Sequence, residues 1–395
     1  MGSFFNLKMK KRIQNLLLTG FLVRFLACLV YYFFFEPNEL KPIINGAYQG
    51  LGVDGYFQIA RTLWLSGEYA FEVHGAPVHS RPPLHPLLLF ITCSWSDNYW
   101  FFQWFFVSSL LGTLSIYLTY QVAKFFLTPS KALKAAFLVA FHPYLIIIAR
   151  STTFVHLATV LLLSSFYVYW CIREKTSKYI LLGFLCGLCL LTHATFQILP
   201  LVLGILLMYK KNFFYAFIVL LFTFLTVLPW SIRNYLTFRR PIFLVTGMGM
   251  QFWKGEESVF RHKVDIYRKV YEGHTHKPLK IAYFCTIAPA DDDLLWELGI
   301  QKILKEPLEM VKRFFYGIII FLFPHETGWQ KFIFTFVFNL PIYLGIFYTR
   351  RKYGWQTWHL EILFYFLWVL CAFAFFTPHA GYIVVFLPLL ILLCV

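Results

Sequence analysis

Long apolar runs restrict the possible folds of this chain more than any other feature of its sequence. Crossing a bilayer takes about 20 predominantly apolar residues in an α-helix, and fewer where helices shelter one another. Ten segments approach or reach this length, at residues 13–35, 99–121, 135–150, 154–172, 179–193, 196–209, 212–230, 331–348, 360–376 and 382–395. The sequence therefore predicts an all-α polytopic membrane protein with about ten transmembrane helices.

Composition supports this prediction and excludes the main soluble classes. Apolar residues make up 59% of the chain and charged residues 14%, whereas soluble domains are about 45–50% apolar and about 25% charged. The aromatic share of 21% suits a protein with aromatic belts at both membrane surfaces. The net charge of +16 accompanies no recognisable nucleic-acid-binding module. We therefore expect the positive charge to mark cytoplasmic loops and contacts with anionic lipids.

Short basic loops predict the orientation, because such loops stay in the cytoplasm. With ten spans, the basic clusters all fall on one side of the membrane, at residues 8–12, 124–134, 173–178, 210–211 and 350–352. We therefore expect an uncleaved first span with a cytoplasmic N-terminus in the cell membrane.

Two long segments, 36–98 and 231–330, are then outer loops of a single transmembrane domain covering residues 1–395. Helical spacing of apolar residues predicts interfacial helices at 54–66 and 84–95. A third helix is expected after Pro289, with Asp291, Asp292 and Asp293 capping its start rather than binding a metal. Long ordered loops usually carry function, so we expect the chemistry on the outer face.

Charged residues at the outer ends of spans are the candidates for chemistry. Asp54 opens the first interfacial helix, where it could activate a hydroxyl nucleophile or act only as a helix N-cap. Arg81 precedes a double proline, and its guanidinium suits bidentate phosphate binding. Arg150 and Arg233, the latter followed by Asn234, lie where further spans reach the surface. Arg24, midway along the first span, requires a partner inside the bundle.

Several segments, in this order, resemble the GT-C glycosyltransferases, in particular the branch with protein O-mannosyltransferases and lipid A aminoarabinose transferases. They include GVDGYFQIARTLWLSGEY, RPPLHPLLLF, FHPYLIIIARSTTF, LLTHATFQILP, LPWSIRNYLTF with QFWKGEE downstream, and KILKEPLEMVKRFFYG. The resemblance covers most of the chain. It implies a GT-C fold, a sugar donor on a polyprenyl phosphate at the outer leaflet, and an inverting transfer.

The resemblance also implies roles for individual residues. The acid of the first outer loop, here Asp54, matches the catalytic carboxylate. Donor phosphate contacts are expected from Arg81, Arg150, Arg233, Asn234 and Lys254. Acceptor or pocket positions are expected at Tyr56, His85, Glu256, Glu257, His379 and Tyr382.

Two departures from the family pattern stand out. Relatives often carry an acid pair in the first loop, whereas Asp54 is followed by Gly55. Near the last span relatives often have Arg-Tyr, whereas this chain has TPHAGY with His379 and Tyr382. Two alternatives follow: His379 substitutes for the missing arginine, or the activity is altered.

The sequence thus predicts a glycosyltransferase that moves a sugar from a polyprenyl-phosphate donor to a lipid, glycan or protein acceptor at the outer face. No cofactor is expected, and a divalent metal is not predicted. The expected partners are the donor, the acceptor and the bilayer, without nucleic acid. A transporter or flippase of polyprenyl-linked saccharides is the alternative, and a non-catalytic scaffold is a second one.

Overall fold

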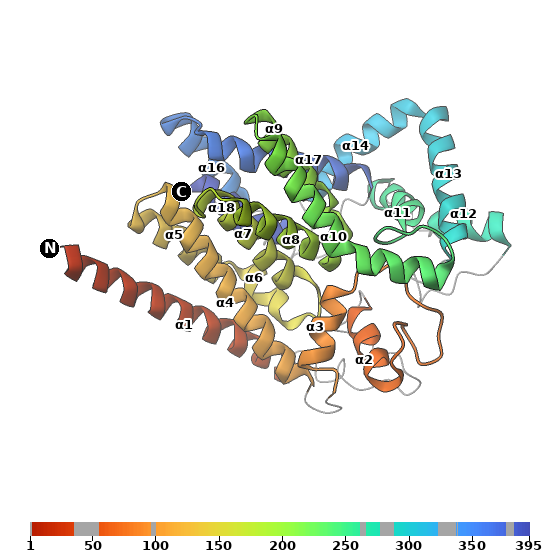
Figure 1. Ribbon diagram of the computed structural model, residues 1–395, viewed down its shortest axis with the longest axis horizontal. Coiled ribbons are helices and arrows are strands. Elements are labelled where there is room, and N and C mark those ends of the chain that lie inside the picture. Colours follow the sequence, from red (N-terminus) through yellow and green to blue (C-terminus); the bar gives the residue numbers. More distant parts are fainter. Residues whose placement is uncertain are drawn as a thin grey trace.

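The chain forms a helical bundle in the computed structural model, which describes residues 2–34, 55–95, 100–260, 266–276, 288–322, 337, 339–376 and 383–395. Within these ranges every regular element is a helix, and the single β contact is an isolated bridge between Ala70 and Pro77. Figure 1 shows the helices in chain order. The predicted all-α architecture is confirmed.

Four helices in the described part of the chain are long and apolar enough to cross a membrane. They are α1 (Gly2–Phe34), α4 (Trp100–Phe126), α10 (Phe213–Phe238) and α17 (Thr357–Phe375). A bent pair also has the length and apolarity of a span, or of a re-entrant loop: α5 (Pro129–Phe141) continues after a 54° bend into α6 (Pro143–Ile147) and the 3-10 turn η1 (Ile148–Arg150).

Four shorter apolar helices lie close to further predicted spans. They are α7 (Val155–Cys171), α8 (Thr176–Thr192), α9 (Ile198–Tyr209) with its preceding turn η2 (Ala194–Gln197), and α18 (Ile383–Cys394). Most of α7 and α8 is packed against other helices, so neither has to meet the lipid along its whole length. Of the span expected at 331–348, helix α16 (Leu340–Tyr353) is described.

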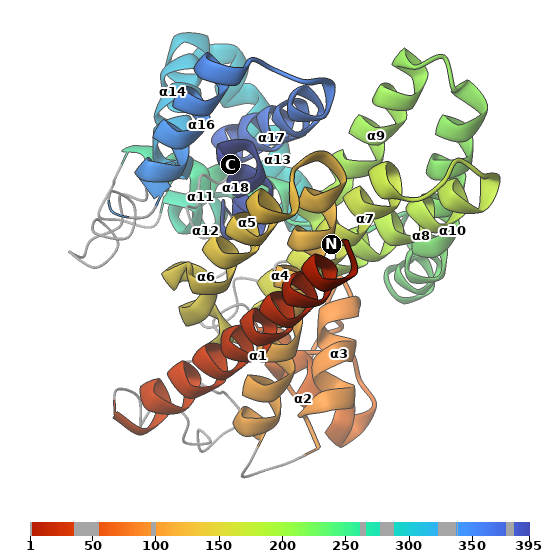
Figure 2. The ribbon, with the colours of Figure 1, turned by 90° about the vertical axis from the view of Figure 1, so that its left-hand side faces the viewer.

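The two predicted outer loops contain six described helices. They are α2 (Tyr56–Ser66), α3 (Leu84–Thr92), α11 (Met248–Phe260), α12 (Ile266–Thr275), α13 (Pro289–Lys305) and α14 (Pro307–Leu322). Helices α2, α3 and α13 confirm the three helices predicted there. Figures 1 and 2 show α2 and α3 at the end of the bundle opposite to α9 and α16.

Helix α14 was not predicted as a separate element, and it packs along α17. A Cβ at Gly317 would lie 2.3 Å from the carbonyl oxygen of Ala374, so glycine permits this close approach. Phe321 stacks on Phe373 with ring centroids 5.0 Å apart. The segment 231–330 is therefore largely helical and is bound to the bundle.

Basic segments from different helices converge at the end formed by α9 and α16. The Lys131 ammonium on α5 lies 5.3 Å from the ring centroid of Tyr353 at the end of α16. Lys210, which follows α9, pairs with Glu361 of α17 at 2.6 Å. Phe126 of α4 stacks on Trp358 of α17 at 4.6 Å. The basic segments 124–134, 210–211 and 350–352 therefore lie at the same end of the bundle, and the side of the membrane that this end faces stays a prediction.

Arg24 is 1% exposed inside the bundle, and it donates to backbone carbonyls. Its Nη1 donates to the oxygens of Gly20 (3.0 Å) and Ala140 (2.9 Å), and its Nη2 donates to Val139 (2.9 Å). Helix α5 ends beside these carbonyls, and Pro143 has no N–H for the oxygen of Val139. Arg24 therefore caps the C-terminus of α5, where the helix dipole favours a cation.

We expect Arg24→Met to destabilise the protein, because the carbonyls of Val139 and Ala140 would lose their donors away from water. Hydrogen bonds to charged groups contribute about 1.5–3 kcal/mol each, so the expected loss is on the order of 3 kcal/mol. Thermal unfolding of the detergent-purified protein measures it. Exposed Arg12 on the same helix is the matched control, and equal effects of Arg12→Met and Arg24→Met would refute the capping role.

Candidate functional site

The first outer loop brings Arg81 against helix α2. The Arg81 guanidinium carbon lies 5.5 Å from the centroid of the Tyr56 ring, and its Nη1 donates to the Ser80 carbonyl at 3.2 Å. The hydroxyl of Tyr69 donates to the carbonyls of Arg81 (3.2 Å) and Pro82 (3.0 Å). The double-proline turn is therefore held in place, with a cation beside the start of α2.

Tyr56, which contacts this cation, forms a buried pair with His85. Tyr56 is 1% exposed and meets the His85 ring edge to face at 5.1 Å. His85 Nε2 donates to the Thr152 carbonyl at 2.8 Å, and burial lowers the pKa of His85 to about 4. His85 is thus neutral at physiological pH, with its proton on Nε2, and it serves to join α3 to the turn before α7.

Gly55, rather than Asp54, occupies the N-cap position of α2. Gly55 has a φ of 76°, and α2 has no side-chain cap hydrogen bond. A Cβ at this position would lie 2.4 Å from Cε1 of Phe71. A left-handed glycine therefore stands where relatives often have a second acid, which explains that departure. Asp54 itself lies outside the described residues, so its role as a base or as a helix cap stays a prediction.

Arg150 lies at the outer end of η1, on the ring of Tyr31 in α1 at 3.6 Å from its centroid. Thr152, which binds His85, follows two residues later. Phe154 then contacts Tyr56 at 6.1 Å and stacks on His193 at 4.0 Å. This turn thus connects Arg150 with the buried pair of Tyr56 and His85 in the Arg81 cluster.

The PW-x-x-RN segment of α10 binds backbone. Asn234 is fully buried, and its Nδ2 donates to the carbonyls of Ile242 (3.3 Å) and Leu244 (3.2 Å). Trp230 Nε1 also donates to Leu244, at 2.7 Å. Arg233 donates to the Val78 carbonyl at 2.9 Å. These contacts tie the first outer loop to the chain that leaves α10, and donor binding by Arg233 and Asn234 stays a prediction.

The W-x-G-E segment of α11, like the PW-x-x-RN segment of α10, makes its contacts within the protein. Trp253 Nε1 donates to the Leu295 carbonyl of α13 at 2.9 Å. A Cβ at Gly255 would lie 1.8 Å from the carbonyl oxygen of Phe376 at the end of α17. Glu256 is buried and pairs with Arg313 (3.1 Å) and Lys302 (3.2 Å). Lys254, between Trp253 and Gly255, is half-buried.

Arg313 of α14 is the residue that sequence reasoning missed. It is 1% exposed, and besides Glu256 it binds three carbonyls, those of Phe252 (2.7 Å), Phe375 (2.9 Å) and Phe376 (3.1 Å). The surrounding segment, MVKRFF, is typical of an interfacial anchor. A sequence does not indicate which backbone carbonyls a side chain will bind. Arg313 joins α11, α14 and the end of α17.

The three aspartates at the start of α13 bind different partners. Asp292 accepts from the backbone N–H groups of Gly247 (2.8 Å) and Met250 (3.0 Å). Asp291 accepts from the Tyr271 hydroxyl at 3.1 Å, and Asp293 pairs with Arg240. Asp291 and Asp292 lie in the first turn of α13, as predicted, but the hydrogen bonds of Asp292 cap the start of α11 instead. Burial raises the pKa of Asp292.

Four predicted site residues cannot be placed. Asp54, His379 and Tyr382 lie outside the described residues, as does the side chain of Glu257. Among the described residues, no group of three or more His, Cys, Asp or Glu side chains could hold a metal ion.

Comparison with known proteins agrees with this architecture. Residues 80–232 match the sequence family described as dolichyl-phosphate-mannose-protein mannosyltransferase. No curated protein sequence matches the chain.

Solved structures of the oligosaccharyltransferase AglB from Archaeoglobus fulgidus share the fold. The complex with an inhibitory peptide and a dolichol-phosphate has a TM-score of 0.54 at 16% identity, covering 95% of this chain and 50% of that one. The form tethered to an acceptor peptide gives 0.52 at 14% identity, with 95% and 49% covered. The present chain thus spans about half the length of AglB.

ArnT from Cupriavidus metallidurans bound to undecaprenyl phosphate is also similar, at 14% identity with 95% of this chain and 76% of that chain covered. Its TM-score is 0.39. The resemblance to GT-C glycosyltransferases is confirmed: this is a multi-pass membrane protein with a GT-C fold, and residues 80–232 are similar to the mannosyltransferase family.

We predict that Glu256→Gln and Arg313→Met will each destabilise the protein strongly. Removing one partner of a buried ion pair leaves the other charge uncompensated, which costs about 3–5 kcal/mol. Thermal unfolding of purified protein measures the loss. Arg240→Met, which breaks the more exposed pair with Asp293, is the control and should cost less than about 1 kcal/mol. A mild effect at Glu256 and Arg313 would show that this pair does not hold the three helices together.

Proposed function

We propose that this chain is a glycosyltransferase that transfers a sugar from a polyprenyl-phosphate carrier to a lipid, glycan or protein acceptor. The proposal rests on the contact between Arg81 and the Tyr56 ring. Tyr56 is the first residue of α2 and follows Asp54 by two positions, so a cation lies beside the helix start next to Asp54 in the sequence. The family match supports it, since residues 80–232 include Arg81 and Arg150. The dolichol-phosphate in the AglB complex supports a carrier of this chemical class.

In the proposed reaction Asp54 takes the proton of the acceptor hydroxyl. The acceptor oxygen bonds to the anomeric carbon while the bond from that carbon to the carrier phosphate breaks. Configuration inverts, and the phosphate leaves with the electron pair. Arg81 stabilises the negative charge on that phosphate. No cofactor enters these steps.

The other cations have secondary roles in this proposal. Arg150 extends the positive field from η1, and Arg233 holds Val78 near the double-proline turn. Lys254 and Glu256 lie in the second outer loop, where we place the acceptor side, together with Glu257, His379 and Tyr382. His85 positions Tyr56 and stays neutral, because burial lowers the pKa of its imidazole to about 4.

We place the reaction at the outer face of the cell membrane. Support comes from the basic segments, which gather at the end of the bundle away from α2 and α3, as Figures 1 and 2 show. Positive clusters favour the cytoplasm, so the N-terminus is assigned to the cytoplasm and the Arg81 cluster to the outside.

Arg81→Ala should weaken donor binding by roughly 10- to 150-fold, because a charge-assisted contact to phosphate contributes about 1.5–3 kcal/mol. Arg81→Lys keeps the charge but loses the bidentate geometry, and should fall between wild type and alanine. Binding of a defined polyprenyl-phosphate sugar to purified protein measures this. Arg240→Ala removes an outer-loop cation paired with Asp293 and should bind donor normally. Unchanged affinity in folded Arg81→Ala would remove Arg81 from the site.

Asp54→Asn should abolish most transfer while leaving donor binding intact. A general base contributes typically about 10²- to 10⁴-fold, and asparagine keeps the shape of aspartate without its basicity. The assay follows glycosyl product formed from a defined polyprenyl-phosphate sugar. Asp293→Asn, a half-exposed acid on α13, is the matched control.

Normal transfer by a well-folded Asp54→Asn protein would end the catalytic assignment. A flippase would instead form no glycosyl product in wild type or variant, and would move the polyprenyl-linked sugar between leaflets. The assay with wild-type protein therefore separates the enzyme from the transporter before any variant is compared.

A further inference from the structure

Helix α14 runs antiparallel to α17, along the half of α17 that lies away from the basic segments (Figure 1). Near the start of α14, Arg313 donates to the Phe375 carbonyl at 2.9 Å. Eight residues later, Phe321 meets Phe366 with ring centroids 6.4 Å apart. Eight helical residues rise about 12 Å, and one leaflet of the hydrocarbon core is about 15 Å thick. Because α17 is long and apolar enough to span the membrane, α14 lies beside it at bilayer depth.

The end of α14 lies inside the bundle. Phe321 is fully buried, and the Tyr343 hydroxyl of α16 donates to the Leu322 carbonyl at 3.4 Å. Helix α16 continues from Tyr343 to the basic residues 350–352. Carbonyls at a helix end need such donors where no water is present. Helices α14 and α16 together therefore extend from one end of α17 to the other.

Charged residues occupy only the first half of α14. They are Glu309, Lys312 and Arg313, and the nine residues that follow, 314–322, are uncharged and mostly apolar. Lysine and arginine near the membrane surface keep their charged groups in the aqueous phase while their stems cover apolar surface. The change of character after Arg313 therefore matches the point at which a helix enters the bilayer.

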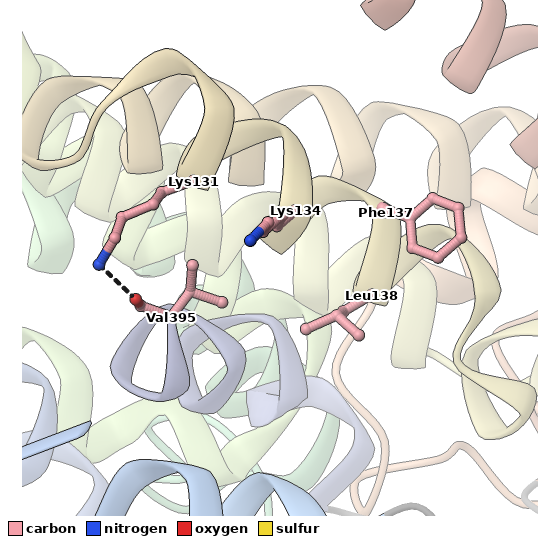
Figure 3. A pocket seen from close by; sticks show the side chains of 5 residues that line it. All are labelled: Lys131, Lys134, Phe137, Leu138 and Val395. Atoms are coloured by element: carbon pink, nitrogen blue, oxygen red, sulfur yellow. Dashed lines mark hydrogen bonds between the residues drawn. The ribbon is translucent and has the colours of Figure 1, made fainter. Parts of the chain in front are cut away.

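Helix α5 shows the same order of residues at the basic end of the bundle. Figure 3 shows Lys131 and Lys134 ahead of Phe137 and Leu138 on this helix. Phe137 is 53% exposed and Leu138 is 41% exposed, in a bent pair apolar enough for the membrane. Exposed apolar side chains one turn beyond a charged residue are thus a property of membrane-embedded helices in this bundle.

An apolar stripe runs along the side of α14 that faces away from α17. Leu308, Val311, Phe315 and Ile319 are spaced by three and four residues and share this side, and each is at least 50% exposed. The buried residues lie on the opposite side: Met310, Arg313, Gly317 and Phe321. A contiguous exposed apolar surface of this kind marks contact with a membrane or another protein.

We propose that α14 enters the leaflet opposite to the basic segments, and that its apolar stripe contacts the acyl chains of that leaflet. At the same depth on α17, Leu367 and Trp368 are 45% and 48% exposed, so α14 extends a surface that already faces lipid. The second outer loop then ends at Pro307 instead of continuing to residue 330. This placement does not depend on the proposed sugar transfer.

Hydroxyl-radical footprinting of the full native chain in lipid nanodiscs tests the depth of α14. Tyr316 is 56% exposed in the protein and would be oxidised readily in water. We expect acyl chains to exclude water from Tyr316 and so to abolish most of its oxidation. Tyr353, 63% exposed beside the basic residues of α16, is the matched control and should be oxidised. Equal oxidation of the two tyrosines would overturn the proposal.

A pair of cysteine variants separates an inclined helix from one that lies flat on the membrane surface. Leu308 and Ile319 share the stripe but are eleven residues apart, which is about 16 Å along the helix. In nanodiscs a water-soluble maleimide should modify Leu308→Cys and leave Ile319→Cys unmodified, while both react fully after denaturation in SDS. Equal reactivity in the bilayer would mean a flat helix and would overturn the proposal.

Lipid as the contacting partner is tested with phosphatidylcholine that carries a photoactivatable diazirine in its acyl chain. In nanodiscs that hold one copy of the protein, illumination should crosslink this lipid to residues 314–322, as it should to α17 near Trp368. Crosslinks at α17 without crosslinks at α14 would show that another segment of protein covers the stripe, and would overturn the lipid contact.

Discussion

Backbone carbonyls freed at helix breaks need donors, and the bilayer core offers no water to supply them. In this bundle side chains from neighbouring helices fill that need. Arg24 caps the end of α5 from α1. The turn at residues 149–152 receives three donors, namely Ser108 at 2.5 Å, Trp104 at 2.8 Å and His85 at 2.8 Å. The breaks after α5 and after η1 are thus bound from other helices.

The candidate site is also held together by side chains that donate to backbone carbonyls of other segments. Helix α10 ends in donors that hold residues 242–244, and Arg233 reaches from there to the Val78 carbonyl. His79 binds Thr246 through its side chain, while its carbonyl accepts from the Thr246 N–H at 3.2 Å. The first outer loop and the start of the second therefore form one layer. A substitution in either loop should therefore affect the position of the turn that carries Arg81.

Periodicity predicted most helices, because apolar spacing reports burial directly, whereas the partners of buried polar groups escaped prediction. Arg24 was expected to need a partner, yet its partners are carbonyls, which every residue carries. Asp292 was expected to cap its own helix, but tertiary packing brought the start of α11 to its carboxylate. Arg313 was not singled out, since neither Glu256 nor the end of α17 is near it in sequence. The predicted roles of Asp54, His379 and Tyr382 stay predictions.

The segments that make this chain resemble glycosyltransferases mostly bind its own backbone. Asn234 and Trp230 hold the chain after α10, and Trp253 and Gly255 let α11 lie against α13 and α17. Such residues specify how the helices meet, and they would be required whichever sugar or acceptor is used. The resemblance therefore indicates the fold before it indicates the reaction. In the proposed function the chemistry rests on a much smaller set, centred on the guanidinium of Arg81 beside the first turn of α2, and this is why substitutions there discriminate between functions that share the fold.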